Sequence, residues 1–286
     1  MFSELLKNRI FTAEALKTDL SSVLFITLHS STKEVNDALE RSSAQHEDYD
    51  NIIIKEGECL KGFIPRERLK KFKGDLSSQY IKFDNYIFSA NESIDNIITR
   101  ISKDMEKSEF PRIYLISKEE NQMGVMTYAD LNRRSVYIYN YIIISFVEQW
   151  LRARIAQNYK ERGRILSEKW MNSLKQIDRK KLLRFSSLKH ESTLSVASLK
   201  DLIYVFKNDS SFEELRSRFG EVIPDETLND IISIRDRIMH PTKLLVSKNK
   251  KREDMQILKR ISKLSTDFLV RKDRNEKNQG WASFPL

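Results

Sequence analysis

The sequence is nearly without cysteine and has no arrangement of histidines suited to a metal. Cys59 is the single cysteine among 286 residues, which excludes a disulfide framework and a zinc site built from paired thiolates. We expect Cys59 to pack as a small apolar side chain. His29, His46 and His190 are scattered without ligand spacing, so no metal site is predicted. Gly-rich phosphate loops and Gly-x-Ser-x-Gly motifs are also absent, which argues against the enzyme classes defined by them.

No apolar run is long enough to cross a bilayer. Residues 136–147 form the most apolar stretch, but Asn140 and Ser145 interrupt it and Glu148 ends it. A transmembrane helix needs about 20 consecutive apolar residues. The first ten residues lack the apolar core of a secretory signal. The sequence therefore predicts a soluble, cytoplasmic protein.

Positive charge is concentrated in the second half of the chain. Residues 1–134 carry 20 basic and 22 acidic side chains, whereas residues 135–286 carry 30 and 19. Together with the chain length, this asymmetry predicts two domains, 1–134 and 135–286. The basic half indicates a polyanion partner such as RNA, although a solvated helical surface has the same composition.

The first half contains an internal repeat that aligns on Gly62 and Gly124. Residues 60–69 match residues 122–131, and an apolar strand followed by a polar turn precedes each glycine. Further upstream, each copy has an amphipathic helix that follows a polar cap. The apolar positions of these two helices are Val35, Ala38, Leu39, Ile94, Ile97, Ile98 and Ile101. The order helix, strand, turn, strand, helix thus occurs twice.

Residues 124–130 read GVMTYAD, and this Gly-apolar-x-Thr-x-x-Asp pattern in a repeat resembles a tandem pair of CBS domains. The resemblance implies an α/β module that binds an adenine nucleotide or a nucleotide second messenger. In that family the threonine contacts phosphate and the aspartate accepts from ribose hydroxyls, roles that fall here on Thr127 and Asp130. Pro65 and Arg68 occupy the equivalent places in the first copy, so at most one site is complete. An ordinary helix cap and a surface acid would give the same two residues without a ligand.

The second half is predicted to be helical. Residues 135–159 form one long helix that is apolar nearly all round from 136 to 147, so it is buried on more than one side. Further helices are predicted at 167–176, 194–208, 212–219 and about 254–270. Glu148 is expected either near Arg235 across the bundle or on the open side of the helix.

A helix that ends before Pro241 carries the most informative motif. Its apolar residues follow helical spacing and are Leu228, Ile231, Ile232, Ile234, Ile238 and Met239. The residue before a proline is pushed out of the helical region, so His240 lies at the helix C-terminus. Arg235 would hold a phosphate bidentately and His240 would move a proton near neutral pH. By spacing alone, an exposed arginine and a helix-capping histidine fit better.

Residues 235–241 read RDRIMHP, and this run after an apolar helix resembles the Arg-polar-x3-His signature of HEPN domains. Those are small all-helical domains, many of which are metal-independent ribonucleases of bacterial defence, toxin and stress systems that act as dimers. The resemblance places catalytic roles on Arg235, Asp236 and His240. Asp236 stands where asparagine is commoner in the family, and its implied role is to orient His240 or Arg235 of a partner chain. The join of the two halves at residues 130–134 also resembles bacterial CBS–HEPN-type proteins.

We therefore expect an α+β protein, with an α/β tandem CBS-like pair over residues 1–134 and an all-α HEPN-like bundle over residues 135–286. The expected function is a nucleotide-regulated, metal-independent endoribonuclease of phage defence or a stress response. It would act as a homodimer on RNA, leave a 2′,3′-cyclic phosphate and need no cofactor for catalysis. The alternative is a non-catalytic RNA- or protein-binding sensor or dimerisation protein, in which Arg235 and His240 are structural.

Overall fold

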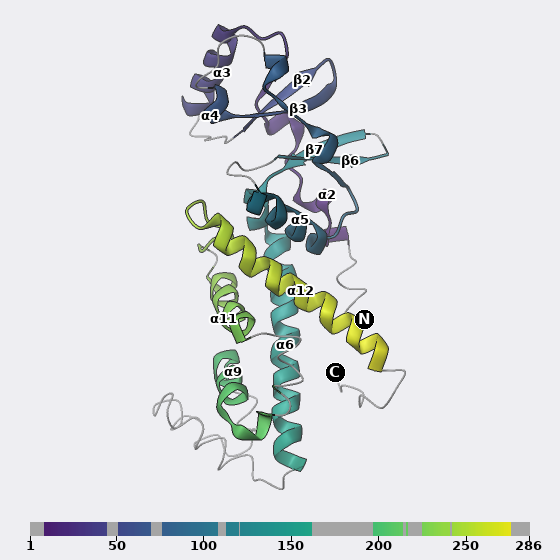
Figure 1. The fold of residues 1–286 in the computed structure, drawn as a ribbon, viewed down its shortest axis with the longest axis vertical. Helices are drawn as coiled ribbons and strands as arrows, with labels where there is room; N and C mark the ends of the chain where they lie inside the picture. Colours follow the sequence, from purple (N-terminus) through teal and green to yellow (C-terminus); the bar gives the residue numbers. More distant parts are fainter. Residues whose placement is uncertain are drawn as a thin grey trace. The chain divides into compact units, whose positions relative to one another are not determined.

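The strands of the first half form two sheets with the same pairing scheme (Figure 1). The first sheet has the order β1 (Phe25–Thr27), β2 (Asn51–Glu56), β3 (Cys59–Pro65) and β4 (Ile81–Lys82). The second has the order β5 (Ile87–Ser89), β6 (Tyr114–Lys118) and β7 (Asn121–Met126). In each sheet the first strand is parallel to the second, and the second is antiparallel to the third. The computed structural model describes residues 9–44, 51–69, 76–107, 113–119, 121–161, 197–213, 216, 225–240 and 242–275.

The strand register confirms the repeat. Ile54 of β2 lies opposite Gly62, and Ile116 of β6 lies opposite Gly124. A bulge follows Ile54 in the first sheet and Ile116 in the second, at equivalent positions. The sequence pattern misses β1 and β5, because a strand of three residues shows too little alternation to be recognised.

Helices α3 (Thr32–Ala44) and α4 (Arg66–Leu69) belong to the first copy, and α5 (Ile94–Lys107) belongs to the second. Alternate residues of β2 face opposite sides of the sheet. Ile52 and Ile54 pack in a core with Val35 of α3, whereas Ile53 packs with Leu115 in a core that joins the two sheets. Because β2 is buried on both faces, its sequence is a continuous apolar run rather than an alternation.

Equivalent positions of the two copies meet at Leu60 and Gln122. The Gln122 side chain accepts a hydrogen bond from the Leu60 amide at 2.7 Å and donates one to the Leu60 carbonyl at 3.3 Å. Equivalent residues of a repeat come together only near the axis that relates the copies. The pseudo-two-fold axis therefore passes close to this pair.

Gly62 and Gly124 each allow a second backbone to pass close by. A Cβ atom on Gly62 would lie 2.2 Å from the carbonyl oxygen of Ile81, and one on Gly124 would lie 2.7 Å from that of Thr18. Thr18 exchanges two backbone hydrogen bonds with Val125, of 2.7 and 3.1 Å. The N-terminal segment thus has the same role beside β7 that β4 has beside β3.

The other helical elements in the described part of the first half are short. These are η1 (Arg9–Phe11), α2 (Ala13–Leu16), η2 (Leu20–Ser22), η3 (Leu76–Ser78), η4 (Phe83–Asn85) and η5 (Tyr128–Asn132). Cys59 is exposed, so the expectation that it packs as an apolar side chain was wrong. It is the first residue of β3, and strand alternation turns the next residue, Leu60, into the core instead.

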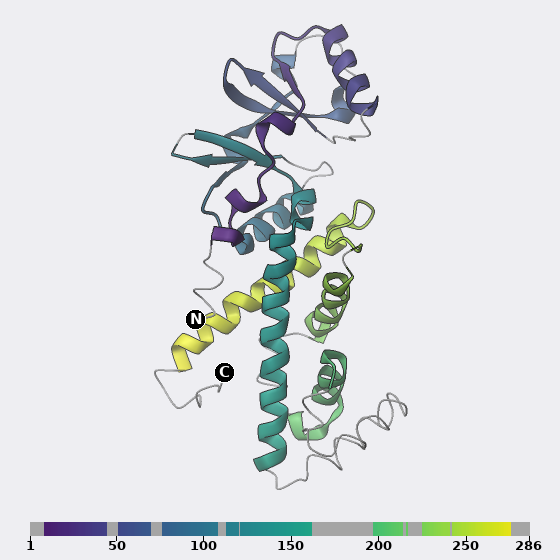
Figure 2. The same cartoon turned by 180° about the vertical axis from the view of Figure 1, so that it is seen from behind.

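Helices alone were found after β7 in the part of the chain that the structure describes. They are α6 (Arg134–Glu161), α9 (Leu199–Asn208), η6 (Ser210–Phe212), α11 (Asp225–Met239) and α12 (Lys251–Asn275). In both views α9 and α11 follow one another along the same side of α6 (Figures 1 and 2). The fold class is thus as predicted, a mixed α/β region followed by a largely helical one. The helix predicted at 167–176 and most of that at 212–219 lie outside the described residues.

The chain divides into two compact units, and the division is not a single cut. One unit comprises Met1–Tyr139 and Leu244–Lys259, and the other comprises Asn140–Lys243 and Arg260–Leu286. Two of the three boundaries fall inside helices, α6 and α12, and the third follows Lys243 in the loop between α11 and α12. That residues 1–134 and 135–286 are separate domains stays a prediction.

The apolar stretch of α6 is only partly covered within one chain. Val136, Ile143 and Val147 are buried, whereas Ile138 is 38% exposed and Tyr141 is 52% exposed. Ile138 and Tyr141 are three positions apart and therefore lie on one side of the helix. None of the helices in the described ranges is long and apolar enough to cross a membrane.

Alanine at either glycine tests the close backbone approach. We expect Gly62→Ala to lower the free energy of unfolding by about 1–3 kcal/mol, the usual cost of forcing a methyl group into a packed site. Gly124→Ala should cost less, because its contact is longer. At an open strand position, glycine to alanine would instead raise the free energy of unfolding by about 0.5–1 kcal/mol. The sign of the change therefore distinguishes a close backbone approach from an open position. Urea unfolding beside Lys61→Ala, an exposed neighbour on β3, measures the effect. A Gly62→Ala protein as stable as the wild type would contradict the close approach.

Candidate functional site

Helix α11 presents the three residues to which the sequence analysis assigns catalysis. Leu228, Ile231 and Ile234 are buried and form the core side of the helix. The helix begins at Asp225 and ends at Met239, so His240 is the first residue beyond its C-terminus, as predicted. His240 is on the exposed side of the helix, and Arg235 lies between the buried and exposed sides.

An ion pair with α12 holds the buried side of α11 in place. Nε of Arg260 donates to Oδ2 of Asp230 at 2.6 Å, and Nη1 of Arg260 lies 3.3 Å from Oε1 of Glu226. The hydrogen bond to Asp230 is the main reason that the pKa of Arg260 is raised. Asp230 is 8% exposed, so loss of Arg260 would leave a largely buried carboxylate unpaired. Together with the buried apolar side of α11, this pair favours one rotation of the helix about its axis and so affects which residues face outward.

Asp236, on the exposed side of α11, lies near two residues that follow the helix, His240 and Lys243. Oδ1 of Asp236 lies 3.4 Å from Nε2 of His240, one helical turn further on. Oδ2 of Asp236 accepts a hydrogen bond from the Lys243 ammonium, which lowers the pKa of Asp236 from its usual value. The structure therefore brings Asp236 and His240 together and adds Lys243, which the sequence analysis did not single out.

Arg235 stands apart from this cluster. Its side chain is half-buried, and no carboxylate in the described ranges forms an ion pair with it. No hydrogen bond among the described residues joins it to Asp236 or His240. Within one chain the structure does not assemble Arg235 and His240 around a common point.

Glu148 pairs with its own helix. Oε1 of Glu148 lies 2.5 Å from Nη2 of Arg152, and the same nitrogen donates to the Ala197 carbonyl at 2.6 Å. This pair, and not Arg235, neutralises the acid in the apolar part of α6. The pair also attaches α6 to the segment that leads into α9.

Thr127 and Asp130 form a capping box at the start of η5. The Thr127 hydroxyl accepts from the Ala129 amide at 3.2 Å, and Oδ2 of Asp130 accepts from the Thr127 amide at 2.8 Å. The turn follows β7 directly, so the strand places both residues. The two residues named by the sequence motif thus contact each other.

The second oxygen of Asp130 is occupied by two further partners. Oδ1 accepts from the Thr18 hydroxyl at 3.0 Å and from Nε of Arg133 at 3.0 Å. Arg133 also donates to the Thr18 hydroxyl at 2.9 Å. The sequence could not indicate Thr18, which is 112 residues away. In the first copy, Arg68 replaces the acid and donates to the Gln79 carbonyl at 3.5 Å, so this network is not repeated there.

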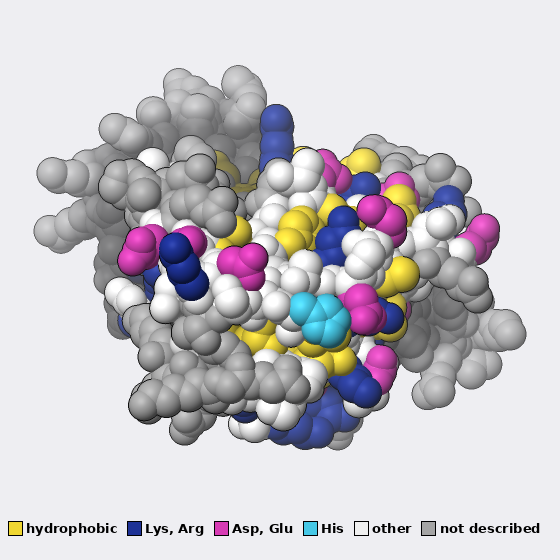
Figure 3. Space-filling model, turned by 90° about the horizontal axis from the view of Figure 1, so that it is seen from above, with side chains coloured by type: hydrophobic (Ala, Val, Ile, Leu, Met, Phe, Trp, Pro, Cys, Tyr) yellow, Lys and Arg dark blue, Asp and Glu magenta, His cyan; other side chains and the backbone are white. Residues whose placement is uncertain are grey.

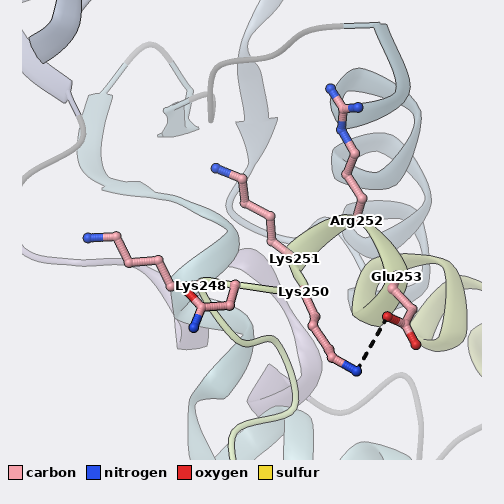
Figure 4. A pocket seen from close by; sticks show the side chains of 6 residues that line it. Lys248, Lys250, Lys251, Arg252 and Glu253 are labelled. Carbon is pink, nitrogen blue, oxygen red and sulfur yellow. Dashed lines mark ion pairs between the residues drawn. The ribbon is translucent and has the colours of Figure 1, made fainter.

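A basic surface surrounds the start of α12 (Figure 4). An open hollow of about 390 Å³ is lined by residues 248–253. Lys250 pairs with Glu253 at 3.8 Å, and Lys251 lies over the Tyr128 ring at 5.6 Å. The side chains of Lys248, Lys251 and Arg252 point in different directions and do not converge on one point. Helix α12 begins at Lys251, slightly before the predicted start near residue 254, so Lys251 and Arg252 belong to the helix.

Charges of both signs occur on the face shown in Figure 3, with apolar side chains exposed between them. The net positive charge of the chain is therefore not gathered into a single basic surface on that face. Among the residues that the structure describes, no three His, Cys, Asp or Glu side chains are grouped to hold a metal ion.

Comparisons with known proteins find likeness only among solved structures. No protein-family model matches the chain, and no curated protein does. The CBS domain of the bacterial CNNM/CorC family Mg2+ transporter covers 45% of this chain and 77% of its own, at 9% identity and a TM-score of 0.35. The same domain in complex with ATP covers 45% and 89%, at 12% identity and a TM-score of 0.33. A CBS-domain pair with bound AMP from Klebsiella pneumoniae covers 42% and 94%, at 11% identity and a TM-score of 0.32.

Proposed function

We propose that the protein is a metal-independent endoribonuclease whose catalytic residues are Arg235, Asp236 and His240. The observation that carries the proposal is the exposure and the ion pairing of these three residues at the end of α11. His240 is exposed and its imidazole lies beside a carboxylate, while Arg235 is half-buried without a described carboxylate partner. A guanidinium without a counter-ion favours an anion such as a phosphate, and an exposed histidine can exchange protons with a substrate.

The reaction is an attack of the RNA 2′-OH on the adjacent phosphorus. One His240 takes the 2′ proton as the 2′ O–P bond forms, and a protonated histidine gives a proton to the 5′ oxygen as the P–O5′ bond breaks. The products are a 2′,3′-cyclic phosphate and a 5′-OH end. Arg235 stabilises the negative charge that develops on the phosphoryl oxygens. The two histidines exchange protonation states during the step, and water restores them.

A homodimer supplies the second histidine. Each chain offers one His240, and Arg235 and His240 of one chain are not joined in the described structure. The exposed apolar residues Ile138 and Tyr141 on α6 provide a surface that a second copy would cover. The composite site would then combine the residues of two α11 helices.

The competing function is a non-catalytic sensor or dimerisation protein that binds RNA or another protein. The specific observation in its favour is that Asp236, His240 and Lys243 are each about half exposed. Ion pairs of this kind are common on solvated surfaces and contribute little. In that case His240 only completes the end of α11.

We further propose that the first half is a CBS-type pair that binds an adenine nucleotide or a nucleotide second messenger at Thr127 and Asp130. Both residues lie at the start of η5, and the Arg133 side chain beside them is 40% exposed and can contact a phosphate. The ribose hydroxyls would donate to the Asp130 carboxylate in place of Thr18 and Arg133. Binding therefore competes with contacts that the chain already makes.

The first test of catalysis is cleavage of single-stranded RNA in the presence of EDTA. We expect Arg235→Ala and His240→Ala each to lower kcat by about 10²–10⁴-fold, the usual range for loss of acid–base help. The matched control is Lys200→Ala, which removes an exposed cation from α9 without touching α11. Circular dichroism checks that each variant is folded. Near wild-type cleavage by either folded variant excludes the assigned residues.

The composite site predicts complementation between two inactive chains. Mixed Arg235→Ala and His240→Ala proteins should regain a small part of the activity, because the heterodimer site has one Arg235 and one His240 from different chains. Full activity is not expected, since the second histidine is missing and water must protonate the 5′ oxygen. Light scattering should give a dimer at micromolar concentration, and Tyr141→Asp should shift it towards monomer. Gln149→Asp, at another exposed position of α6, is the control. A wild-type monomer under these conditions removes the basis for a composite site.

Nucleotide binding at Asp130 predicts sensitivity to the ribose hydroxyls. ATP should raise the melting temperature of the wild type by mass action, and 2′-deoxy-ATP should do so less, because one hydroxyl is missing. Asp130→Asn should remove this difference in calorimetry, since the amide is a weaker acceptor than the carboxylate. Asp84→Asn, an exposed acid of η4, is the control. If no nucleotide of a panel gives a thermal shift or a heat of binding, the CBS-type pair has a structural role and the proposed binding is wrong.

A further inference from the structure

Lys243 closes the turn that follows α11. Its amide donates to the His240 carbonyl at 2.8 Å, which brings its side chain back towards the helix. The ammonium then forms an ion pair with Oδ2 of Asp236, while the other oxygen, Oδ1, lies 3.4 Å from Nε2 of His240. One carboxylate therefore bridges an ammonium and an imidazole, and all three groups are in the same compact unit.

The contact with Asp236 distinguishes the two nitrogens of His240. The negative charge of Asp236 Oδ1, 3.4 Å from Nε2, attracts an N–H and repels a lone pair, so we expect Nε2 to be the nitrogen that carries a proton. When the ring is neutral, Nε2 is then the N–H and Nδ1 keeps the lone pair. Only Nδ1 is free to accept a proton from a substrate.

Asp236 can fix the ring only if its own position is fixed. It is an exposed side chain near a helix end, and without a second partner it would sample several rotamers. The Lys243 ion pair restricts it, and the backbone bond from Lys243 to His240 ties both partners to the same turn. Lys243 thus positions Asp236, and Asp236 in turn positions the His240 ring.

We propose that Lys243 is a positioning residue of the ribonuclease site, which holds Asp236 so that His240 transfers protons through Nδ1. This inference rests on the proposed function. In the cleavage step, Nδ1 of His240 takes the proton of the RNA 2′-OH while the 2′ oxygen bonds to phosphorus. The 5′ oxygen leaves with a proton from the protonated histidine of the second copy.

A direct contact between Lys243 and the RNA phosphate is the competing role, and kinetics separate the two. A phosphate contact acts on substrate binding, so its loss raises KM and weakens the salt dependence. A positioning residue acts on the chemical step, so its loss lowers kcat and leaves KM nearly unchanged.

The experiment compares Lys243→Met, Lys243→Arg and the control Lys200→Met in the full chain, with single-stranded RNA in EDTA. We expect Lys243→Met to lower kcat by roughly tenfold, less than the ~10²–10⁴-fold attributed to the histidine itself. Lys243→Arg should restore most of kcat, because a guanidinium also pairs with a carboxylate. A rise in KM at unchanged kcat, or no rescue by arginine, overturns the positioning role.

Nitrogen-15 NMR of the histidine rings gives a readout that does not need activity. The chain has four histidines, and the His240 signals are assigned by their loss in His240→Gln. The neutral ring should be almost entirely the Nε2–H form in the wild type. Asp236→Asn and Lys243→Met should both shift it towards the tautomer mixture of a free histidine side chain, and Lys243→Arg should not. An unchanged ring in Lys243→Met overturns the inference. A wild type that shows these ring signals but cleaves no RNA overturns the proposed function instead.

Discussion

Two backbone hydrogen bonds between Thr18 and Val125 attach the N-terminal segment to β7. The contacts around Asp130 depend on this attachment. The two backbone bonds are formed only because Gly124 has no side chain where the Thr18 carbonyl passes. Once Thr18 is in place, its hydroxyl contacts Asp130, and Asp130 in turn caps η5 and binds Arg133. Arg133 is the residue after which α6 begins, and its carbonyl accepts from the Val136 amide at 2.9 Å. A close approach at one glycine thus determines how the long helix starts.

The same network determines which internal contacts a ligand at the proposed nucleotide site would have to replace. The Asp130 carboxylate already accepts hydrogen bonds from three residues of the chain, Thr18, Thr127 and Arg133. A ligand there exchanges internal contacts for its own, so its net affinity is the difference between two sets of hydrogen bonds. Such an exchange would alter the hold of Thr18 and Arg133 on the start of α6. A change of this kind is what a regulatory ligand requires.

At the end of α11, a buried constraint and an exposed arrangement are coupled. The Asp230–Arg260 pair restricts the helix on its inner side, where an unpaired charge would be costly. On its outer side, Asp236 and His240 lie one helical turn apart, and the turn after the helix brings Lys243 back to the Asp236 carboxylate. The outer pairs are too exposed to contribute much to stability. In the proposed ribonuclease site, they would orient the His240 ring.

The sequence by itself determined the features that repeat at short range. Helical spacing indicated α11 and the position of His240 just beyond its end, and the two glycine motifs revealed the repeat that the strand register bears out. The three residues proposed for catalysis, Arg235, Asp236 and His240, likewise lie within seven consecutive residues. Tertiary structure decided which of these groups meet. The partners of Asp130 include Thr18, 112 residues away, and the orientation of α11 depends on Arg260, thirty residues beyond Asp230. Cys59 became exposed and Glu148 became paired for reasons of strand alternation and helix packing. A local pattern records periodicity and near neighbours, whereas contacts between distant segments exist only after the backbone has folded, and these contacts decide which oxygen, nitrogen or ring faces which.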